Sequence, residues 1–488
     1  MKKIIVLLIG FCISVQAQGM MMKDTVFREY DIRGKVDGEL CIEDMYRLGK
    51  AIAYFFKEHN PDLSSIALGM DGRTHSPQIK DELVRALVDS GIDVTFIGMC
   101  TTPVLYFALY NLPVDGGLMI TASHNPKEYN GIKLCLDKVS VWGLQVQEIK
   151  KLFKEGKALC SDRTGVVTDY PLIPTYINWL AEHFSDLKDM SLSAVVDCGN
   201  GAAGTVLPQL IERMGWKNVS LLYADVDGTY PNHEANPTEI KNMQDVYATL
   251  QKTDIAVGVG LDGDCDRMDP MTRSGYLVPG DQLLALFSQD MLKRYPGAGV
   301  VFGVKSSQGL IDLLTSWDAR PYMSPTGHAI VKDQMRKHGA LLGGELSCHF
   351  FFNDEYFGYD DGIYAMMRLF RILTDTGKSL EELLKVFPEK VSTPEYFVSC
   401  DDEQKEAVMQ KIRSDFEQEA NARLITIDGV RAVFDYGWGI VRASNTTPKL
   451  TIRFESDTQE GLRKIKETFV SRLSPYFEES VLRQSFAL

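Results

Sequence analysis

A four-part pattern that occurs three times is the feature that most constrains the fold of this chain. Each copy has a short apolar segment, a polar turn, an amphipathic segment of helical length and a second apolar segment. The copies run over residues 65–97, 194–223 and 299–323. Strand, turn, helix and strand in this order form a βαβ unit, which implies a mainly parallel sheet covered by helices. We therefore expect three related mixed α/β domains.

The last hundred residues do not repeat this pattern. Charged helical segments precede three predicted strands and an amphipathic helix, at 432–435, 439–443, 450–454 and 459–473. This order is typical of an α+β domain. Because 488 residues are too many for one ordinary core, we predict the following division: 1–19, a leader or an upstream start; 20–165, α/β domain I; 166–275, α/β domain II; 276–388, α/β domain III; and 389–488, α+β domain IV.

Ser123 is presented on a polar turn directly after an apolar strand. The segment 117–126 reads Gly-Leu-Met-Ile-Thr-Ala-Ser-His-Asn-Pro. A hydroxyl in this position is either a nucleophile or a simple turn residue, and by itself the turn is the commoner interpretation. The G-x-S-x-G motif of esterases is absent, so esterase chemistry gains no support.

Three aspartates alternate along the loop that follows the apolar run 255–259. Asp262, Asp264 and Asp266 would point to one side of an extended loop and would raise each other's pKa values. A hard divalent cation would relieve this repulsion, whereas the alternative is a solvated acidic turn. An EF-hand is excluded because it needs Gly at the position of Arg267 and Glu at that of Arg273.

Two further polar loops follow. The segment 343–349, Gly-Gly-Glu-Leu-Ser-Cys-His, is a weak signal by itself. The segment 442–448, Arg-Ala-Ser-Asn-Thr-Thr-Pro, combines one guanidinium with four small hydrogen-bonding side chains, a set that suits a phosphate group.

Together with Tyr-Asp-Ile-Arg-Gly at 30–34, these loops resemble the α-D-phosphohexomutase superfamily, in particular its phosphomannomutase/phosphoglucomutase branch. Five motifs match in order, and the resemblance covers essentially the whole chain after the leader. It implies four domains around a central cleft, three alike and the last different, as the patterns above also indicate.

The resemblance also implies roles for individual residues. Ser123 would carry phosphate in the resting enzyme, and with Asp262, Asp264 and Asp266 it would hold Mg²⁺. The catalytic residues, among which the acid and base roles fall without individual assignment, would be Ser123, His124, Arg33, Lys133 and His349. The substrate-binding residues would be Tyr30, Arg267, Lys305, His328, Glu345, Ser347, Arg442, Ser444, Asn445 and Thr446.

The implied reaction interconverts hexose 1-phosphate and hexose 6-phosphate through phosphoserine, with a hexose 1,6-bisphosphate as intermediate and activator. The loop at 345–349 is similar to the mannose/glucose type, so mannose and glucose phosphates are the expected substrates. Glutamine in place of Leu346 would indicate glucosamine phosphate, and phosphoglucosamine mutase is the alternative.

Two more remote alternatives come from other classes of protein. A haloacid-dehalogenase-type phosphatase would use Asp262 as its nucleophile, but its D-x-D-x-T/V pattern needs Thr or Val where Asp266 stands. A non-catalytic sugar-phosphate-binding protein would not need an intact serine, acidic trio and phosphate loop.

Three features depart from the family pattern. Cys348 stands where glycine or alanine is usual, Asp269-Pro270 falls in a segment where an uninterrupted strand is expected, and the leader has no counterpart. The leader begins with two lysines and an apolar run at 4–15, followed by a site similar to those cut by signal peptidase. Met20, Met21 and Met22 offer later starts, which we favour.

The formal charge of −14 argues against nonspecific binding to nucleic acid or to an anionic membrane. Nine scattered cysteines without a CxxC pair indicate free thiols and a reducing compartment. We therefore expect a cytoplasmic monomer or small homo-oligomer that acts on small hexose phosphates, although the signal-like segment also fits an exported form.

Overall fold

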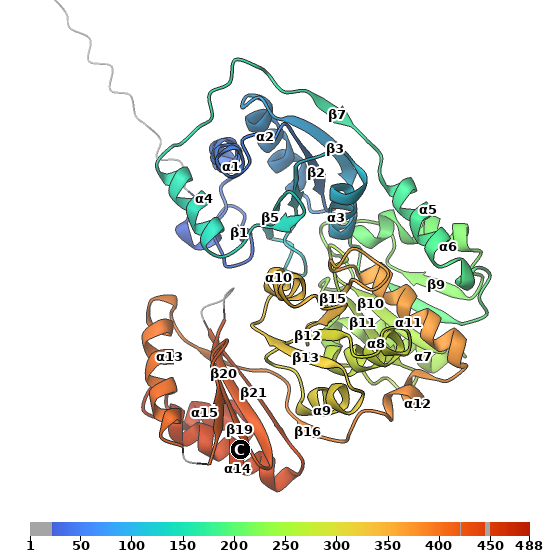
Figure 1. Cartoon of the computed structure of the whole chain (residues 1–488), viewed down its shortest axis with the longest axis vertical. Coiled ribbons are helices and arrows are strands. Elements are labelled where there is room, and N and C mark those ends of the chain that lie inside the picture. Colours follow the sequence, from blue (N-terminus) through green and yellow to red (C-terminus); the bar gives the residue numbers. More distant parts are fainter. Residues whose placement is uncertain (1–21, 420, 445–448) are drawn as a thin grey trace, which may run out of the picture.

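The computed structural model of the chain describes residues 22–419, 421–444 and 449–488. These residues form four sheets, one after another along the sequence. In Figure 1 the first sheet lies at the top, the second and third lie at the right, and the last lies at the lower left. The predicted class, three α/β units followed by an α+β unit, is confirmed.

The first sheet has the order β1-β5-β4-β2-β3-β7, with β6 paired to β5. Helices α1, α2 and α4 share one apolar core on one face, whereas α3 is buried along almost its whole length because it also packs against the second unit. The strands are β1 (Ile32–Lys35), β2 (Ser65–Met70), β3 (Asp93–Met99), β4 (Gly116–Ile120), β5 (Tyr129–Leu136), β6 (Val139–Ser140) and β7 (Val167–Asp169), and the helices are α1 (Met45–His59), α2 (Ser76–Val88), α3 (Thr102–Asn111) and α4 (Leu144–Lys154).

The second sheet has the order β11-β10-β8-β9. Strands β10, β8 and β9 are parallel to one another, and β11 is antiparallel to β10. Asp269 and Pro270 lie inside β11, which is not interrupted, so the expected departure has no effect on the strand. Proline is tolerated there because β11 is an edge strand. The elements are α5 (Ile173–His183), β8 (Ala194–Asp197), α6 (Leu207–Met214), β9 (Val219–Leu222), α7 (Gln244–Lys252), β10 (Val257–Leu261) and β11 (Met268–Thr272).

The third sheet has the order β13-β12-β14-β15, and the pairs β12–β13 and β12–β14 are parallel. Its apolar side chains join those of the first two units in one continuous core. The elements are α8 (Gly280–Arg294), β12 (Gly299–Gly303), α9 (Gln308–Ser316), β13 (Arg320–Ser324), α10 (His328–His338), β14 (Leu342–Gly344), β15 (Phe350–Phe352), α11 (Gly362–Thr376) and α12 (Leu380–Leu384).

The last sheet is antiparallel, in the order β16-β21-β20-β19-β18 with β17 paired to β21. It has a core of its own, and a small apolar cluster of Val304, Trp438 and Ile440 packs it against the third unit. The elements are β16 (Val391–Ser392), β17 (Tyr396–Ser399), α13 (Asp402–Glu417), β18 (Arg423–Ile425), β19 (Val430–Phe434), β20 (Gly437–Ala443), β21 (Lys449–Ser456), α14 (Gln459–Leu473) and α15 (Glu479–Ser485).

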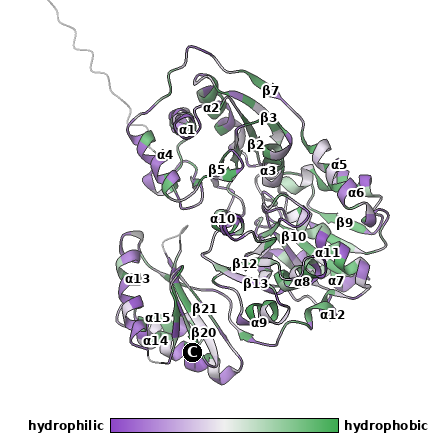
Figure 2. Ribbon diagram, in the orientation of Figure 1, coloured by the Kyte–Doolittle hydropathy of each residue, from purple (hydrophilic) through white to green (hydrophobic). Residues whose placement is uncertain are grey.

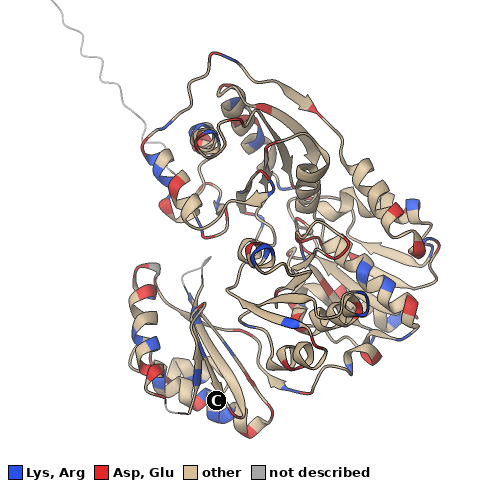
Figure 3. Ribbon diagram, in the orientation of Figure 1, with Lys and Arg blue, Asp and Glu red and all other residues tan. Residues whose placement is uncertain are grey.

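Apolar and charged residues are separated as expected for packed layers. The strands are largely hydrophobic, whereas α13 is largely hydrophilic (Figure 2). Acidic and basic residues both occur along α4 and α13 (Figure 3). Among the residues that the structure describes, none of the helices combines the length and the apolar character needed to cross a bilayer.

Candidate active site

Ser123 lies on the turn between β4 and β5, with its backbone in the left-handed region at φ 51°. This conformation costs a residue with a side chain about 1–3 kcal/mol, so neighbouring contacts must stabilise it. Arg73 provides them, because its Nη2 donates to the carbonyl oxygens of Ser123 (2.7 Å) and Asn125 (2.6 Å). Arg73 is buried, and Asp71 balances its charge. The serine hydroxyl is therefore held in one place by the turn that follows β2.

The acidic loop follows β10 and lies against this serine. Asp262, Asp264 and Asp266 are all buried, and one oxygen from each lies within 4.8 Å of the others. Ser123 Oγ donates to Asp262 Oδ2 at 2.9 Å. Two loops separated by 139 positions in the sequence thus form one site where the first and second units meet.

Gly263 permits the close approach of the two loops. A Cβ atom at this position would lie 2.6 Å from the carbonyl oxygen of Ser123, so any larger residue would push the loops apart.

Two further side chains bind the acidic loop. Lys133 Nζ donates to Asp264 Oδ2 at 2.8 Å and also to Asp266. Thr102, the first residue of α3, donates its hydroxyl to Asp264 Oδ2 at 2.6 Å. Arg267 Nε also lies 3.8 Å from Asp262 Oδ2. Burial, together with the charges of Asp266 and Asp264, raises the pKa of Asp262 well above its usual value.

The oxygen atoms of this cluster fit a hard divalent cation. Carboxylate and hydroxyl oxygens are the ligands that such ions prefer. Asp264 Oδ1 is buried and has no hydrogen-bond partner among the described residues, so it has a free position for a ligand. Asp262, Asp264 and Asp266 therefore form a candidate metal centre with Ser123 beside it.

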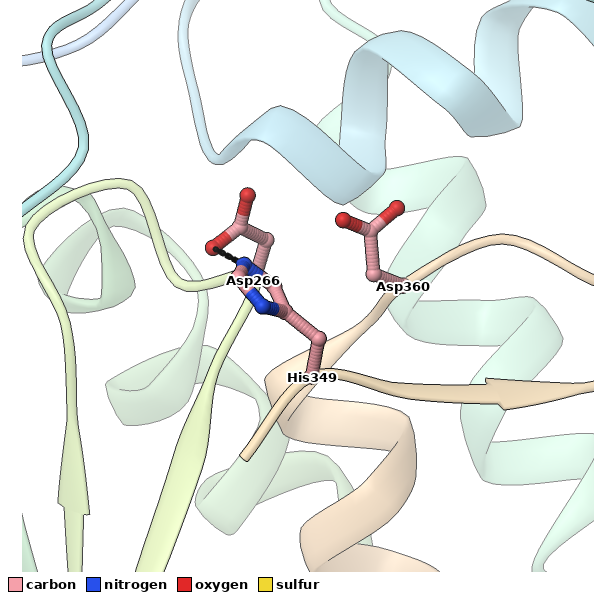
Figure 4. A group of neighbouring side chains, drawn as sticks. All are labelled: Asp266, His349 and Asp360. Atoms are coloured by element: carbon pink, nitrogen blue, oxygen red, sulfur yellow. Dashed lines mark ion pairs between the residues drawn. The ribbon is translucent and has the colours of Figure 1, made fainter. Parts of the chain in front are cut away.

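His349 lies between Asp266 and Glu345. Its Nε2 is 3.3 Å from Asp266 Oδ1, and its Nδ1 is 3.2 Å from Glu345 Oε2. Burial alone would lower the pKa of His349, but Asp266 and Glu345 raise it to about 9. Figure 4 shows Asp360 close to Asp266 and His349. His349 thus forms ion pairs with Asp266 and Glu345 and lies close to Asp360.

His124 follows Ser123 on the turn, and Arg33 contacts the residues beside it. His124 Nδ1 is 3.1 Å from Ser123 Oγ. Burial and the charges of Arg267 and Arg33 lower the pKa of His124 well below its usual value, so this ring is neutral. Arg33, on β1, donates to Asn125 Oδ1 at 2.8 Å.

The loop between β14 and β15 brings three predicted residues to the same place. Glu345 Oε1 accepts from the backbone N–H of Gly327 at 2.7 Å. Ser347 Oγ is 3.1 Å from His349 Nδ1, and Arg267 Nε is 3.2 Å from His349 Nε2. The predicted sugar loop is therefore in contact with the acidic loop.

Two predicted substrate-binding cations, Lys305 and Arg442, lie where the third and fourth units meet, and each is paired with a carboxylate. Lys305 Nζ donates to both oxygens of Glu395, at 2.9 and 3.0 Å. Arg442 Nε donates to Asp428 Oδ2 at 3.0 Å. Tyr30 reaches the same region, where its hydroxyl donates to a carbonyl oxygen just before α10.

The remaining predicted residues have a mixed outcome. His328 begins α10, and its Nδ1 is 3.4 Å from Asp360 Oδ2. Ser444 is buried directly after β20. Asn445 and Thr446 lie outside the described residues.

Several residues that shape the site were not predicted from the sequence. Their only signal was a charged or hydroxyl side chain at the end of a strand or the start of a helix, which many surface turns share. They are Asp71, Arg73, Thr102, Asp360, Glu395 and Asp428.

A buried serine held against three carboxylates, on four α/β and α+β units, defines an enzyme of the phosphoryl-transfer class. Sequence models of the phosphoglucomutase/phosphomannomutase family match the chain in order: alpha/beta/alpha domain I over residues 24–159, domain II over 174–275, domain III over 279–391 and the C-terminal domain over 397–472. The chain belongs to this family. It is an isomerase that moves phosphate within a hexose phosphate. The domain boundaries at 165, 275 and 388 stay predictions.

Relatives support the same assignment. The phosphomannomutase/phosphoglucomutase of Pseudomonas syringae pv. tomato is 41% identical over 459 residues, which cover 93% of this chain and 96% of the relative. A phosphoglucomutase/phosphomannomutase family protein of Burkholderia thailandensis has a crystal structure that is 33% identical with a TM-score of 0.85, covering 93% of this chain and 98% of that one.

A more distant structure shares the fold alone. The N-acetylphosphoglucosamine mutase of Aspergillus fumigatus, with a serine variant bound to glucose 1,6-bisphosphate, is 15% identical with a TM-score of 0.59, covering 93% of this chain and 95% of that one. The same mutase has also been solved with GlcNAc-6P and magnesium.

Proposed function

We propose that Ser123 carries a phosphoryl group in the resting enzyme and transfers it to the free hydroxyl of a hexose monophosphate. The bond between phosphorus and the serine oxygen breaks, and one to the sugar oxygen forms. The resulting hexose 1,6-bisphosphate turns end for end, and Ser123 accepts its other phosphate. The observation that carries this proposal is the 2.9 Å contact between Ser123 Oγ and Asp262 within a buried carboxylate cluster.

Mg²⁺ is the cation that we propose for this cluster, held by Asp262, Asp264, Asp266 and the group on Ser123. When bound, it supplies positive charge that offsets the phosphate and polarises it toward attack. The mutase of A. fumigatus was solved with magnesium and, in another structure, with glucose 1,6-bisphosphate, which supports both assignments.

The two histidines of the site would enter the reaction in different charge states. His124 is neutral and 3.1 Å from Ser123 Oγ, so its Nδ1 is placed to accept the proton of the serine hydroxyl. The contacts of His349 with Asp266 and Glu345 favour its protonated form, so it would offer a proton or a positive charge to the sugar side. General acid–base catalysis needs this kind of separation between two titratable groups.

The phosphate that is already on the sugar would bind at the predicted clamp. Arg442 and Ser444 form its described part, and Asn445 and Thr446 complete it by resemblance. Because the bisphosphate must present either end to Ser123, the clamp has to accept both ends of the sugar.

We further propose that the chain acts in the cytoplasm, because the eight cysteines that the structure describes are free thiols.

Purified chain is expected to interconvert glucose 1-phosphate and glucose 6-phosphate when Mg²⁺ and catalytic glucose 1,6-bisphosphate are present. The conversion is measured by a coupled dehydrogenase assay and by phosphorus NMR. Release of inorganic phosphate without isomerisation would instead indicate a phosphatase, and binding without turnover would indicate a non-catalytic protein.

Mannose and glucose phosphates are expected to give kcat/KM values within about tenfold of each other, since a contact set that ignores one hydroxyl discriminates by less than about 1.4 kcal/mol. Side-by-side kinetics with mannose 1-phosphate, glucose 1-phosphate and glucosamine 1-phosphate test this. A clear preference for the glucosamine phosphate would contradict the assignment.

A further inference from the structure

The segment that contains Lys305 belongs to the third unit, but side chains of the fourth unit donate hydrogen bonds to the backbone of this segment. The carbonyl oxygens of three consecutive residues all accept hydrogen bonds from arginines of the last sheet. Arg431 Nη1, on β19, donates to Val304 at 2.6 Å and to Ser306 at 2.8 Å. Arg453, on β21, donates to Lys305 between them.

The backbone N–H groups of the next two residues are also hydrogen-bonded. The N–H of Ser307 donates to Asp281 Oδ2 and that of Gln308 to Glu455 Oε1, each at 2.9 Å. Glu455 belongs to β21, and Glu395, which binds the ammonium of Lys305, directly precedes β17. Both the main chain and the side chain of this lysine are therefore attached to the fourth unit.

Burying the charged side chain of Arg431 in this position costs free energy. Its side chain is fully buried and stacks on Trp438, with 3.8 Å between Cζ and the ring centroid. Among the described residues, no carboxylate forms an ion pair with it, and its Nε and Nη2 have no hydrogen-bond acceptor. Burial lowers the pKa of Arg431 to about 9. Its two hydrogen bonds to the Lys305 segment are therefore the hydrogen bonds that its side chain makes among the described residues.

We propose that Arg431 is a positioning residue that sets the place of Lys305 relative to the sheet that carries Arg442. β19 and β20 are paired neighbours, so Arg431 and Arg442 belong to one sheet. Arg431 would thereby set the spacing of the two cations that approach substrate phosphate. This inference rests on the proposed function, in which both cations line the substrate site.

Arg431→Met is expected to raise the KM for glucose 1-phosphate about tenfold while kcat changes less than about threefold, because the variant misplaces a binding group and not the serine. The Kd for glucose 1-phosphate, measured by calorimetry, is expected to rise by the same factor. Arg431→Lys keeps the charge and one donor and is expected to recover part of the loss. Arg423→Met, on the neighbouring strand β18 and exposed, is the matched control and is expected to bind like wild type.

A double-mutant cycle with Lys305→Ala decides whether Arg431 acts through that lysine. In the Lys305→Ala background, Arg431→Met is expected to change KM and Kd by less than about twofold, since coupled residues are not additive. Independent tenfold effects in both backgrounds, or a lower melting temperature with unchanged Kd at 25 °C, would overturn the proposal. If Arg431→Met does not fold, the same cycle is run with Arg431→Lys. Since Kd needs no turnover, a wild type that binds but does not isomerise would count against the proposed function and not against Arg431.

Discussion

Replacing Ser123 by alanine is expected to lower the turnover number by about three orders of magnitude or more, because the variant has no atom on which to carry the phosphoryl group. KM should stay within about threefold, since the groups proposed to bind sugar and phosphate lie on other loops. The backbone should keep its place, because Arg73 binds the carbonyl oxygen of residue 123 and not its side chain. Steady-state kinetics in the presence of glucose 1,6-bisphosphate measure both quantities.

A matched control separates the hydroxyl from general damage. Ser288→Ala removes another buried hydroxyl, which bonds only within α8 to the carbonyl oxygen of Leu284 at 2.7 Å, and it should leave turnover unchanged. Phosphopeptide mass spectrometry of wild type should find phosphate on Ser123. Turnover like that of wild type in Ser123→Ala, or covalent phosphate on Asp262, would contradict the mechanism.

The fold was largely predictable because each βαβ copy carries its own local pattern. The helix expected at 459–473 is α14 (Gln459–Leu473), and the first predicted strand is β2 (Ser65–Met70). Ends are less certain where polar residues continue a strand: β21 begins at Lys449 and ends at Ser456, beyond its apolar centre. There the pairing with β20 extends the strand past the limits of hydrophobic periodicity.

The centre of the site was predictable because its chemistry is written in contiguous motifs. Ser123 and the acidic trio can each be recognised from a few neighbouring residues, but the sequence does not show that they lie together in the fold. Thr102 and Arg73 could not be found in this way. Thr102 reaches Asp264 across 162 positions, and nothing in its neighbourhood distinguishes it from an ordinary helix start. Such partners depend on tertiary packing, which a local pattern does not contain.

Three cations of the site have carboxylate partners that the sequence did not reveal. Arg33 donates to Asp31, Lys305 to Glu395 and Arg442 to Asp428. Each of these three cations, which we propose to act at the site, thus already has a carboxylate partner. Phosphate binding would then replace or share an existing ion pair, which costs less reorganisation than fixing a free side chain.

Removal of divalent cations with a chelator is expected to lower activity by about three orders of magnitude or more, and added Mg²⁺ should restore it. The physical reason is the mutual repulsion of three buried carboxylates. Burial and the charges of Asp266 and Asp264 raise the pKa of Asp262 well above its usual value, so a cation that offsets this charge should stabilise the folded chain. At a hundredfold excess over its Kd, a ligand contributes about 2.7 kcal/mol, which should appear as a higher melting temperature.

Asp264→Asn tests whether the trio is the site of that stabilisation. The amide keeps an acceptor oxygen for Lys133 and Thr102 but loses the negative charge, and in wild type Asp264 Oδ1 is a buried oxygen without a hydrogen-bond partner among the described residues. We expect this variant to fold, to lose most of the Mg²⁺-dependent rise in melting temperature and to lose activity in parallel. Asp312→Asn, an exposed carboxylate on α9, should respond to Mg²⁺ like wild type. An undiminished Mg²⁺ response in Asp264→Asn would place the cation elsewhere and leave the phosphoserine without the charge compensation on which the mechanism depends.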